Sequence, residues 1–379
     1  MTKVINRITA VVSIAVIGAL SLLTVLILEG SYSESENRQL HGLPELSLSA
    51  LADGSYFSEL SSCFTDHFAF RRSFVSSDAG LSSGVCERIV NGVYIGNKRL
   101  LDAEISLRGS SEANDEIINR FADNYDGAVY IAAIPTSSGV YSSMLPEYLS
   151  YNGEKQQIDR FYAALNSSVR KIDAYSILKM QTDDYIFYRS DTKWTGYGAY
   201  CVYKTVIQKL GFMPTSYGKY DVRHIADDYC GDLYGRTQYM KSKKDILDIY
   251  EYSDGAEVES CKGYDCEGNS TPVELYDLSA LESVDKYDIY TCGKYPLMRI
   301  HTSVNNERKL LVIMDDMGRN FVPFLLQQYS EVAVVCPKLI NGSMYELIDA
   351  DDYEQTLILI GADSLDDDEL LSPLEKMEE

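Results

Sequence analysis

The sequence is poor in the residues on which several common kinds of site depend. Only four histidines and one tryptophan occur among 379 residues. So few histidines argue against a site built from several imidazole ligands, and without a Cys-x-x-Cys pair a zinc site is not expected. Basic residues are also scarce, since 34 Lys and Arg stand against 57 Asp and Glu, a net charge of −23. A chain this acidic lacks the broad basic surface of a non-specific nucleic-acid binder.

The overall composition is typical of a globular protein. Hydrophobic residues make up 45% and charged residues 24% of the chain, which excludes a disordered or fibrous protein. The length is enough for two average domains or for one large α/β domain with insertions.

A charge-free stretch near the start predicts a membrane anchor. Residues 8–28 contain no charged side chain, and a helix needs about 20 apolar residues to cross a bilayer. Lys3 and Arg7 precede the stretch and Glu29 follows it, so residues 1–7 are expected in the cytoplasm. A cleaved signal peptide is the alternative, but its apolar region usually spans about 7–15 residues and ends in a small-x-small site. The sequence therefore predicts a single-pass cell-membrane protein with an extracytoplasmic C-terminal part.

The eight cysteines leave the disulfide pattern open. Outside the membrane disulfides can form, and eight cysteines allow 105 pairings. Cys261 and Cys266 are close enough in sequence to close a small loop. Cys201 and Cys336 lie in apolar segments, which favours buried thiols.

Hydrophobic periodicity divides the rest into a stalk (29–46), a domain (47–361) and an acidic tail (362–379), which we expect to be solvated and mobile. It predicts helices over 51–71, 154–170, 197–210 and 320–329, the last with Asn320 as N-cap. It predicts strands over 127–135, 183–189, 245–252, 309–314, 331–336 and 355–360, with a loop through 254–272. Apolar strands that alternate with helices favour a mostly parallel sheet covered on both faces.

Three segments carry a family resemblance. They are TyrArgSerAspThrLysTrpThr (188–195), LeuLeuValIleMetAspAspMetGlyArgAsn (310–320) and TyrAspIleTyrThrCysGlyLysTyrProLeu (287–297). The first resembles the signature of the DHHW proteins and of their relatives AlgX and AlgJ, which act in alginate acetylation. Weaker matches occur in the same order at 36–40, 66–71, 134–138 and 230–234. The resemblance covers about residues 36–340.

The resemblance implies a fold and a chemistry. It implies an SGNH-hydrolase-like, flavodoxin-type three-layer α/β sandwich with a mostly parallel sheet, here preceded by the one N-terminal transmembrane helix. It also implies a Ser nucleophile and a His base oriented by Asp, acting without a cofactor on acetyl esters of extracytoplasmic polysaccharides. A hydroxyl needs such a base to take its proton, and donors at a helix N-terminus to stabilise the oxyanion.

The chain departs from that pattern where the chemistry would occur. Asp191 is kept, but the family His falls at Lys193, the Ser at Asp316 and the Asn at Lys294. A Lys with a pKa of about 10.4 cannot accept a proton at neutral pH unless that pKa falls by about three units. We expect Lys193 and Lys294 to face Asp316, with Asp191 behind them. The resemblance also places Trp194, Asp315 and Arg319 beside these residues as candidate binding groups.

Several hypotheses remain open at this point. In the first, the charged residues form a fixed ion cluster in a pseudoenzyme that binds a glycan or a partner in acetylation or export. Alternatively, Asp316 is itself a nucleophile or an acid–base group. A different nucleophile is also conceivable, such as Ser137, or Ser303 near His301. A surface structural or adhesion protein would use only the fold. The acidic charge favours a neutral glycan over a polyanion, and Trp194 is as well explained by packing as by sugar stacking.

Overall fold

The computed structural model describes residues 88–103, 112–146, 149, 153–239, 241–252 and 254–375. Within the first 68 residues it describes 11–15, 18–19, 23–24, 32–33, 38–44, 46–47, 50 and 55–68. Most of the predicted anchor and part of the predicted stalk therefore lie outside the described residues. Within the described ranges, no helix combines the length and the hydropathy needed to cross a bilayer.

The chain divides into two compact units, Met1–Asn91 with Tyr234–Lys241, and Gly92–Leu233 with Ser242–Glu379. The first contains β1 (Tyr32–Ser33), β2 (Arg38–Gln39), α3 (Ser55–Asp66) and β3 (Ile89–Val90), and β1 pairs with β2 in antiparallel fashion. His67 directly follows α3 and is buried. Its Nδ1 lies 3.0 Å from the carbonyl oxygen of Cys63 in the last turns of that helix.

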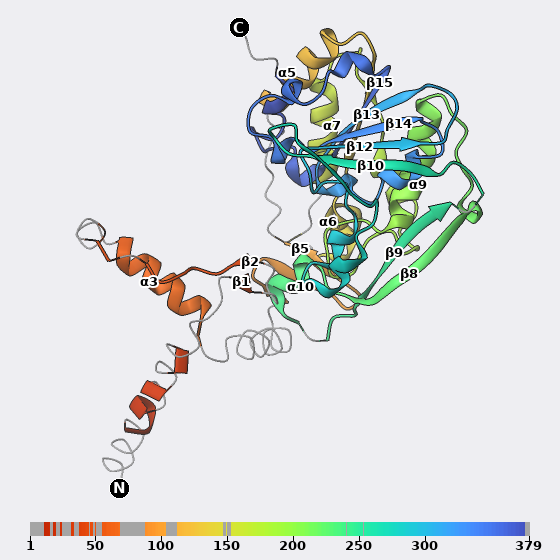
Figure 1. Cartoon of the computed structure of the whole chain (residues 1–379). Coiled ribbons are helices and arrows are strands. Elements are labelled where there is room, and N and C mark those ends of the chain that lie inside the picture. The colour runs from red at the N-terminus through yellow and green to blue at the C-terminus, as the bar shows by residue number, and fades with distance from the viewer. Residues whose placement is uncertain are drawn as a thin grey trace. The chain divides into compact units, whose positions relative to one another are not determined.

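The second unit holds the remaining elements (Figure 1). Its helices are α5 (Glu112–Asp123), α6 (Ser137–Val140), α7 (Gly153–Ala164), α8 (Ala174–Lys179), α9 (Gly196–Lys209) and the start of α10 (Asp232–Thr237). Its strands are β4 (Val93–Ile95), β5 (Leu100–Asp102), β6 (Ala128–Ile134), β7 (Arg170–Lys171), β8 (Tyr220–Tyr229), β9 (Asp245–Tyr252), β10 (Val258–Tyr264), β11 (Ser270–Pro272), β12 (Leu297–Thr302), β13 (Lys309–Met314), β14 (Glu331–Val335) and β15 (Gln355–Gly361). Short 3₁₀ turns include η6 (Asp316–Gly318), η7 (Val322–Leu325), η11 (Ala362–Ser364) and η12 (Ser372–Leu374).

One large sheet organises this unit. Its strands follow the order β11-β10-β12-β14-β13-β15-β6-β7. The five strands from β14 to β7 run parallel, and β12, β10 and β11 extend the sheet through antiparallel pairs. The sheet is therefore mostly parallel, as the sequence predicts. Strands β8 and β9 form a separate antiparallel pair.

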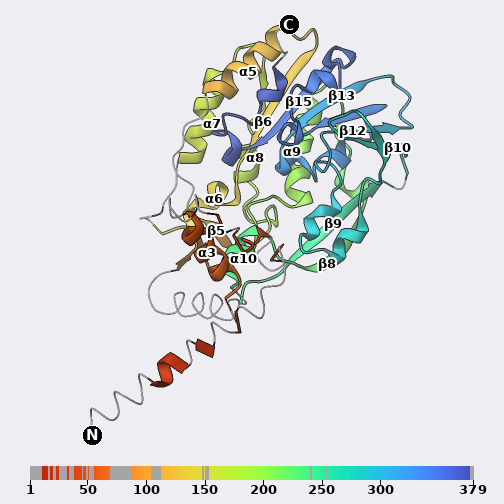
Figure 2. The same ribbon diagram turned by 60° about the vertical axis from the view of Figure 1, so that its left-hand side comes forward.

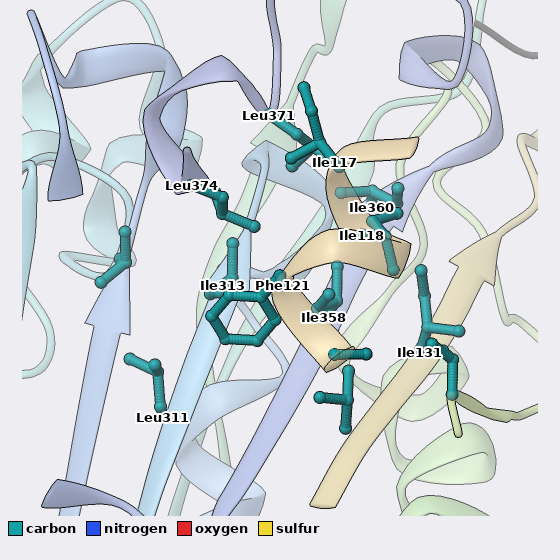
Figure 3. Packing of buried hydrophobic residues seen from close by; sticks show 14 of the residues in the cluster. Ile117, Ile118, Phe121, Ile131, Leu311, Ile313, Ile358, Ile360, Leu371 and Leu374 are labelled. Atoms are coloured by element: carbon teal, nitrogen blue, oxygen red, sulfur yellow. The ribbon is translucent and has the colours of Figure 1, made fainter. Parts of the chain in front are cut away.

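Helices cover both faces of the sheet. On one face α5 and α7 bury a continuous apolar core over β6, β13 and β15, and Figure 3 shows Phe121 of α5 packed beside Ile313 and Ile358. On the other face the amide of Gln355 in β15 donates to the carbonyl of Leu210 at the end of α9, at 3.1 Å. Figure 2 shows this layered arrangement from a second direction.

The apolar strands of the sheet agree with the sequence prediction. Strands β6, β13, β14 and β15 are almost wholly buried, which explains their continuous Val, Ile and Leu runs. The expected helices near 51–71, 154–170 and 197–210 appear as α3, α7 and α9, and β9 matches 245–252. Helix α7 is shorter than predicted, since it ends at Ala164.

Other local predictions are wrong. Residues 183–189 form no strand, because the backbone N–H groups of Arg189 and Ser190 turn toward the carboxylate of Asp245, each at 2.8 Å. Residues 320–329 form only η7 within a turn, because the Asn320 amide donates to the carbonyl of Trp194 at 3.0 Å instead of capping a helix. The expected loop at 254–272 contains β10 and β11, whose small and polar residues hide the alternation of strands.

The predicted acidic tail also packs. Leu365, Leu370, Leu371 and Leu374 are buried in the apolar core, and 362–375 contains two 3₁₀ turns. Its carboxylates at 367–369 are exposed while the leucines point inward. The charge run indicates one solvated face of a packed segment rather than a mobile tail.

Candidate active-site pocket

A pocket lies where the parallel strands end. Segments that follow β13, β14 and β15 meet there with residues 192–193, around a cavity of about 430 Å³. Its charged lining consists of Lys193, Asp315, Asp316, Lys338, Asp363 and Asp367. The carboxyl edge of a parallel sheet is the usual place for a ligand site in this kind of fold. We call this cavity the edge pocket.

Hydrogen bonds fix residues 191–194 at this edge. The carbonyl of Thr192 accepts from the Ser137 N–H at 3.2 Å, which joins it to the segment after β6. The carboxylate of Asp245 accepts from the backbone of Arg189 and Ser190 and from the Ser190 hydroxyl. Asp245 is fully buried and so organises the turn that precedes Asp191.

Trp194 locks this segment to the segment after β13. Its Nε1 donates to the carbonyl of Met317 at 2.7 Å, and its indole stacks on Phe321 with ring centroids 6.0 Å apart. The side chain is 0% exposed, so it presents no face to a ligand. Packing, and not sugar stacking, is the role that this position allows.

Asp191 is buried beside a cation. Tyr229 donates its hydroxyl to Oδ2, the Lys193 N–H donates to Oδ1 at 3.3 Å, and Lys193 Nζ lies 3.5 Å from Oδ1. Burial opposes ionisation, but the Lys193 ammonium and these hydrogen bonds outweigh it and hold the pKa of Asp191 below its ordinary value. Gly231 leaves room for this carboxylate, because a Cβ there would lie 2.4 Å from Oδ2.

Lys193 is held in its protonated form. Burial favours the neutral amine, but the carboxylates of Asp191, Asp285 and Asp316 outweigh it and raise the pKa of Lys193 above its ordinary value. The ammonium also lies 5.3 Å from the ring centroid of Tyr287, within the range of a cation–π contact. Lys193 therefore carries a charge at neutral pH and cannot serve as a base.

Asp316 is exposed at the mouth of the pocket. It begins η6, directly after Asp315, and its side chain is 57% exposed. Arg319 Nη1 lies 3.9 Å from Asp316 Oδ1, but most donors of this guanidinium face inward. Arg319 is buried and donates to the carbonyls of Tyr290 and Cys292. It thereby holds the segment at 290–293 in place.

Lys294 does not join the cluster as expected. Its ammonium lies 3.7 Å from Asp277 and 3.8 Å from Asp288, and among the described residues no ion pair connects it to Asp316. The expectation that two lysines face Asp316 is wrong for Lys294, because Asp277 and Asp288 attract its charge elsewhere. Asp288 also accepts from Arg319 Nη2 at 3.0 Å.

A second group of carboxyls lies at the same edge of the sheet. Asp315 accepts from the N–H groups of Met317 at 2.9 Å and Gly361 at 2.7 Å. A Cβ on Gly361 would lie 2.3 Å from Asp363 Oδ1 and 3.2 Å from Asp315 Oδ2, so the two carboxyls converge above this glycine. Burial, and then the nearby Asp363, raise the pKa of Asp315 to about 7.

Glu154 belongs to the same acidic group. It lies in the first turn of α7 and accepts from the N–H of Thr136 at 2.9 Å and from the Thr136 hydroxyl at 2.6 Å. Burial raises the pKa of Glu154 to about 8, and Asp363 contributes to the rise. In the described part of the chain, no group of three or more His, Cys, Asp or Glu side chains is arranged to hold a metal ion.

Of the alternative nucleophiles, Ser137 lies beside Asp191 and Ser303 lies at the other edge of the sheet. Ser137 is fully buried, and its hydroxyl donates to the carbonyl of Asp191 at 3.3 Å. His301 and Ser303 lie at the end of the antiparallel strand β12, beside Glu331 at the start of β14 and so at the opposite edge of the sheet. The Ser303 hydroxyl accepts from the Glu257 N–H at 2.9 Å.

Sequence reasoning missed four residues of this region, namely Tyr229, Asp245, Glu154 and Asp363. Tyr229 directly precedes the weak motif at 230–234, which was a usable signal. Asp363 lies two residues after β15 (Gln355–Gly361), where a parallel strand delivers side chains to the edge of the sheet. For Asp245 and Glu154 the sequence contains no comparable signal.

A comparison of the sequence with models of protein families identifies the family of this chain. The profile of the family described as "DHHW protein" matches residues 106–335, which is more than half of the chain. The chain belongs to the DHHW family. No curated protein matches this DHHW chain significantly.

Solved structures with the same fold agree with this assignment. A DHHW family protein from Eubacterium siraeum is 21% identical, with a TM-score of 0.63 over 75% of this chain and 96% of that chain. PatB1 of Bacillus cereus, solved with a sulfonyl adduct, is 16% identical, with a TM-score of 0.60 over 72% of this chain and 95% of that chain. The O-acetyltransferase domain of Pseudomonas putida AlgJ is more distant, at 15% identity over 73% and 92% of the chains with a TM-score of 0.44. At these identities the first two likenesses show a shared fold and not a shared activity.

Proposed function

We propose that this DHHW protein is a membrane-anchored, extracytoplasmic SGNH-like protein that has lost its hydrolase-type catalytic set. It binds a glycan or a partner protein in the O-acetylation or assembly of cell-surface polysaccharide. The motifs at 188–195, 287–297 and 310–320 support the family context. The charge-free stretch at 8–28 supports the anchor.

One observation carries the loss of catalysis. The residue at the position of the family base, Lys193, is a protonated amine paired with Asp191 at 3.5 Å. The position of the family nucleophile holds the carboxylate of Asp316 instead of a hydroxyl. Among the described residues that line the pocket, the aliphatic hydroxyls belong to Thr192 and Ser364, and there is no imidazole. Ester transfer by the family's Ser–His mechanism therefore lacks both its hydroxyl nucleophile and its imidazole base.

The exposure of Asp316 favours one alternative function. A carboxylate that is 57% exposed at the pocket mouth can reach a substrate, and carboxylates act as nucleophiles in some enzymes. In that case the Asp316 carboxylate would bond to an acyl or glycosyl carbon while the bond from that carbon to the substrate's alcohol oxygen breaks, and water would then hydrolyse the covalent intermediate and restore the carboxylate. The ester-hydrolysis experiment described next distinguishes this function from the loss of catalysis.

The first test compares acetyl-ester hydrolysis by the full-length wild type with that by Asp316→Ala. We expect equal, background rates from both proteins on a chromogenic acetyl ester. Turnover above background that disappears in Asp316→Ala would overturn the loss of catalysis and make Asp316 a catalytic residue.

The second test rebuilds the family set. The double variant Lys193→His, Asp316→Ser places an imidazole beside Asp191 and a hydroxyl after β13. We expect it to gain ester hydrolysis and a covalent adduct with a sulfonyl fluoride, and the wild type and both single variants to form none. Labelling of the wild type at residue 316 would contradict the proposal.

A further inference from the structure

A second cavity lies apart from the edge pocket and shares no lining residue with it. It has a volume of about 360 Å³ and lies among β8, β9, the start of β10 and residues 274–278. This volume falls within the range of about 300–1,000 Å³ that is usual for small-molecule sites. Four tyrosines line it, namely Tyr220, Tyr250, Tyr252 and Tyr276. We call it the tyrosine groove.

Side chains already satisfy the main chain of the groove. The hydroxyl of Tyr276 donates to the Tyr250 carbonyl at 3.0 Å and accepts from the Tyr250 N–H at 3.2 Å. The amide of Gln327 makes the same pair of bonds with Ala256, both at 2.9 Å. Because these backbone groups are occupied, a peptide cannot extend the sheet here by strand addition.

The aromatic walls are held in fixed positions. Tyr220 meets Tyr252 edge-on with ring centroids 5.6 Å apart, and it meets Tyr250 in the same way at 6.4 Å. The chain folds closely over Tyr252 because residue 255 is glycine, where a Cβ would lie 2.1 Å from the ring. Tyr252 is half-buried at the rim, so part of its ring stays open to a ligand. Such a preorganised ring loses little entropy when a ligand stacks on it.

The polar rim is acidic. Glu257 and Glu274 are exposed, and within the described part of the chain neither carboxylate takes part in an ion pair. Glu251 is paired with Arg223 at 3.0 Å, so this guanidinium is already neutralised. The rim therefore repels phosphate and carboxylate groups and offers hydrogen-bond acceptors to hydroxyl groups.

We propose that the tyrosine groove binds a neutral saccharide. The C–H groups on one face of a sugar ring carry partial positive charge and stack on the negative face of a tyrosine, while the sugar hydroxyls donate to Glu257 and Glu274. A purely apolar ligand would leave these carboxylates unused, and an anionic one would be repelled. The proposal deepens the proposed function, because it assigns glycan binding to a place outside the edge pocket.

Calorimetric titration of the full-length protein in detergent tests this site, with neutral tetrasaccharides of glucose, mannose and N-acetylglucosamine as probes. We expect at least one of them to bind, and Tyr252→Ala to weaken that binding roughly tenfold. Tyr252→Phe keeps the ring and is expected to bind like the wild type, which separates stacking from misfolding. The double variant Glu257→Gln, Glu274→Gln should weaken the neutral probe about threefold and strengthen binding of tetragalacturonate.

The proposal would be overturned by no binding of any neutral probe to the wild type, by undiminished binding in Tyr252→Ala, or by tighter binding of tetragalacturonate than of the neutral sugars to the wild type. Asp316→Ala serves as the control in the edge pocket and should bind the probe normally. Loss of binding in Asp316→Ala alone would move the glycan to the edge pocket. Ester turnover would refute the loss of catalysis without affecting this result, so the two proposals can fail separately.

Discussion

Two sets of carboxyls at the same sheet edge have pKa values that shift in opposite directions. Asp191 has a cation 3.5 Å away, and its pKa is lowered although its side chain is almost completely buried. Glu154 and Asp315 each accept at least two hydrogen bonds, but within the described residues neither forms an ion pair with a cation, and their pKa values rise to about 8 and about 7.

The difference shows that hydrogen bonds alone do not offset burial here. A cation adjacent to the carboxylate decides whether the buried group keeps its charge. The edge pocket thus combines a permanent ion pair with neighbouring carboxyls that exchange protons near neutrality. Burial also raises the pKa of Asp363, which interacts electrostatically with members of both sets.

Among the variants considered, Glu154→Gln should change the stability of the protein most. Glu154 titrates near 4.5 when unfolded and near 8 when folded, so between these values the folded state holds one more proton. Wild-type stability therefore falls as the pH rises through this window, by up to about 1.4 kcal/mol per pH unit. Glu154→Gln resembles the protonated acid, so its free energy of unfolding should not fall in this way. Relative to the wild type the variant should become more stable as the pH rises, by up to about 4 kcal/mol near pH 8. Urea denaturation at several pH values measures the difference.

The control for Glu154→Gln is its behaviour in acid. Near pH 4 the wild-type carboxyl is protonated in both states, so the variant and the wild type should be equally stable. A difference between the two proteins that stays constant from pH 4 to pH 8 would show that Glu154 does not bind an extra proton on folding.

Replacement of Lys193 by Met removes the cation of the ion pair with Asp191. It leaves Asp191 buried without its cation, and we expect a loss of about 3 kcal/mol at pH 7. The loss should shrink as the pH falls toward 4, because a protonated Asp191 needs no partner. The double variant Asp191→Asn, Lys193→Met should recover part of the stability. An equal loss at both pH values, measured by chemical denaturation, would contradict the role of the ion pair.

The sequence predicted the parts of this molecule that follow local rules. Strands such as β13 are buried on both faces, so their apolar runs are visible without any structure. The meeting of Asp191 and Lys193 at the pocket came from the family resemblance. Periodicity cannot show that the Trp194 indole donates to Met317, 123 positions later in the chain.

The rest depended on contacts between distant residues. Lys294 was misplaced because its ion pairs with Asp277 and Asp288 depend on how the segments at 277–294 fold together. Asp363 was assigned to a mobile tail because the acids at 366–369 mask the leucines that bury this segment. The tyrosine groove went unnoticed because its residues come from four separate stretches of the chain.

Trp194→Phe tests how the two carboxyl sets are kept in place. Trp194 is adjacent to Lys193, and its Nε1 bonds the carbonyl of Met317, next to Asp316. Phenylalanine preserves the stacking on Phe321 but leaves this buried carbonyl without a donor, which should cost about 2 kcal/mol. Thermal denaturation checks the cost. Wild-type stability in Trp194→Phe would mean that the bond does not hold the two segments together.

Lys294→Met should have the smallest effect, although it is the same substitution as Lys193→Met in the same unit. The partners of Lys294 are Asp277 and Asp288, whose side chains are 43% and 41% exposed, so water replaces the lost cation. The pKa of Asp277 is lowered first by the hydroxyl of Ser279 and only secondarily by Lys294. We therefore expect a loss below about 1 kcal/mol that salt reduces further. If denaturation showed equal losses for Lys294→Met and Lys193→Met, burial of the partner carboxylate would not be what distinguishes the two lysines.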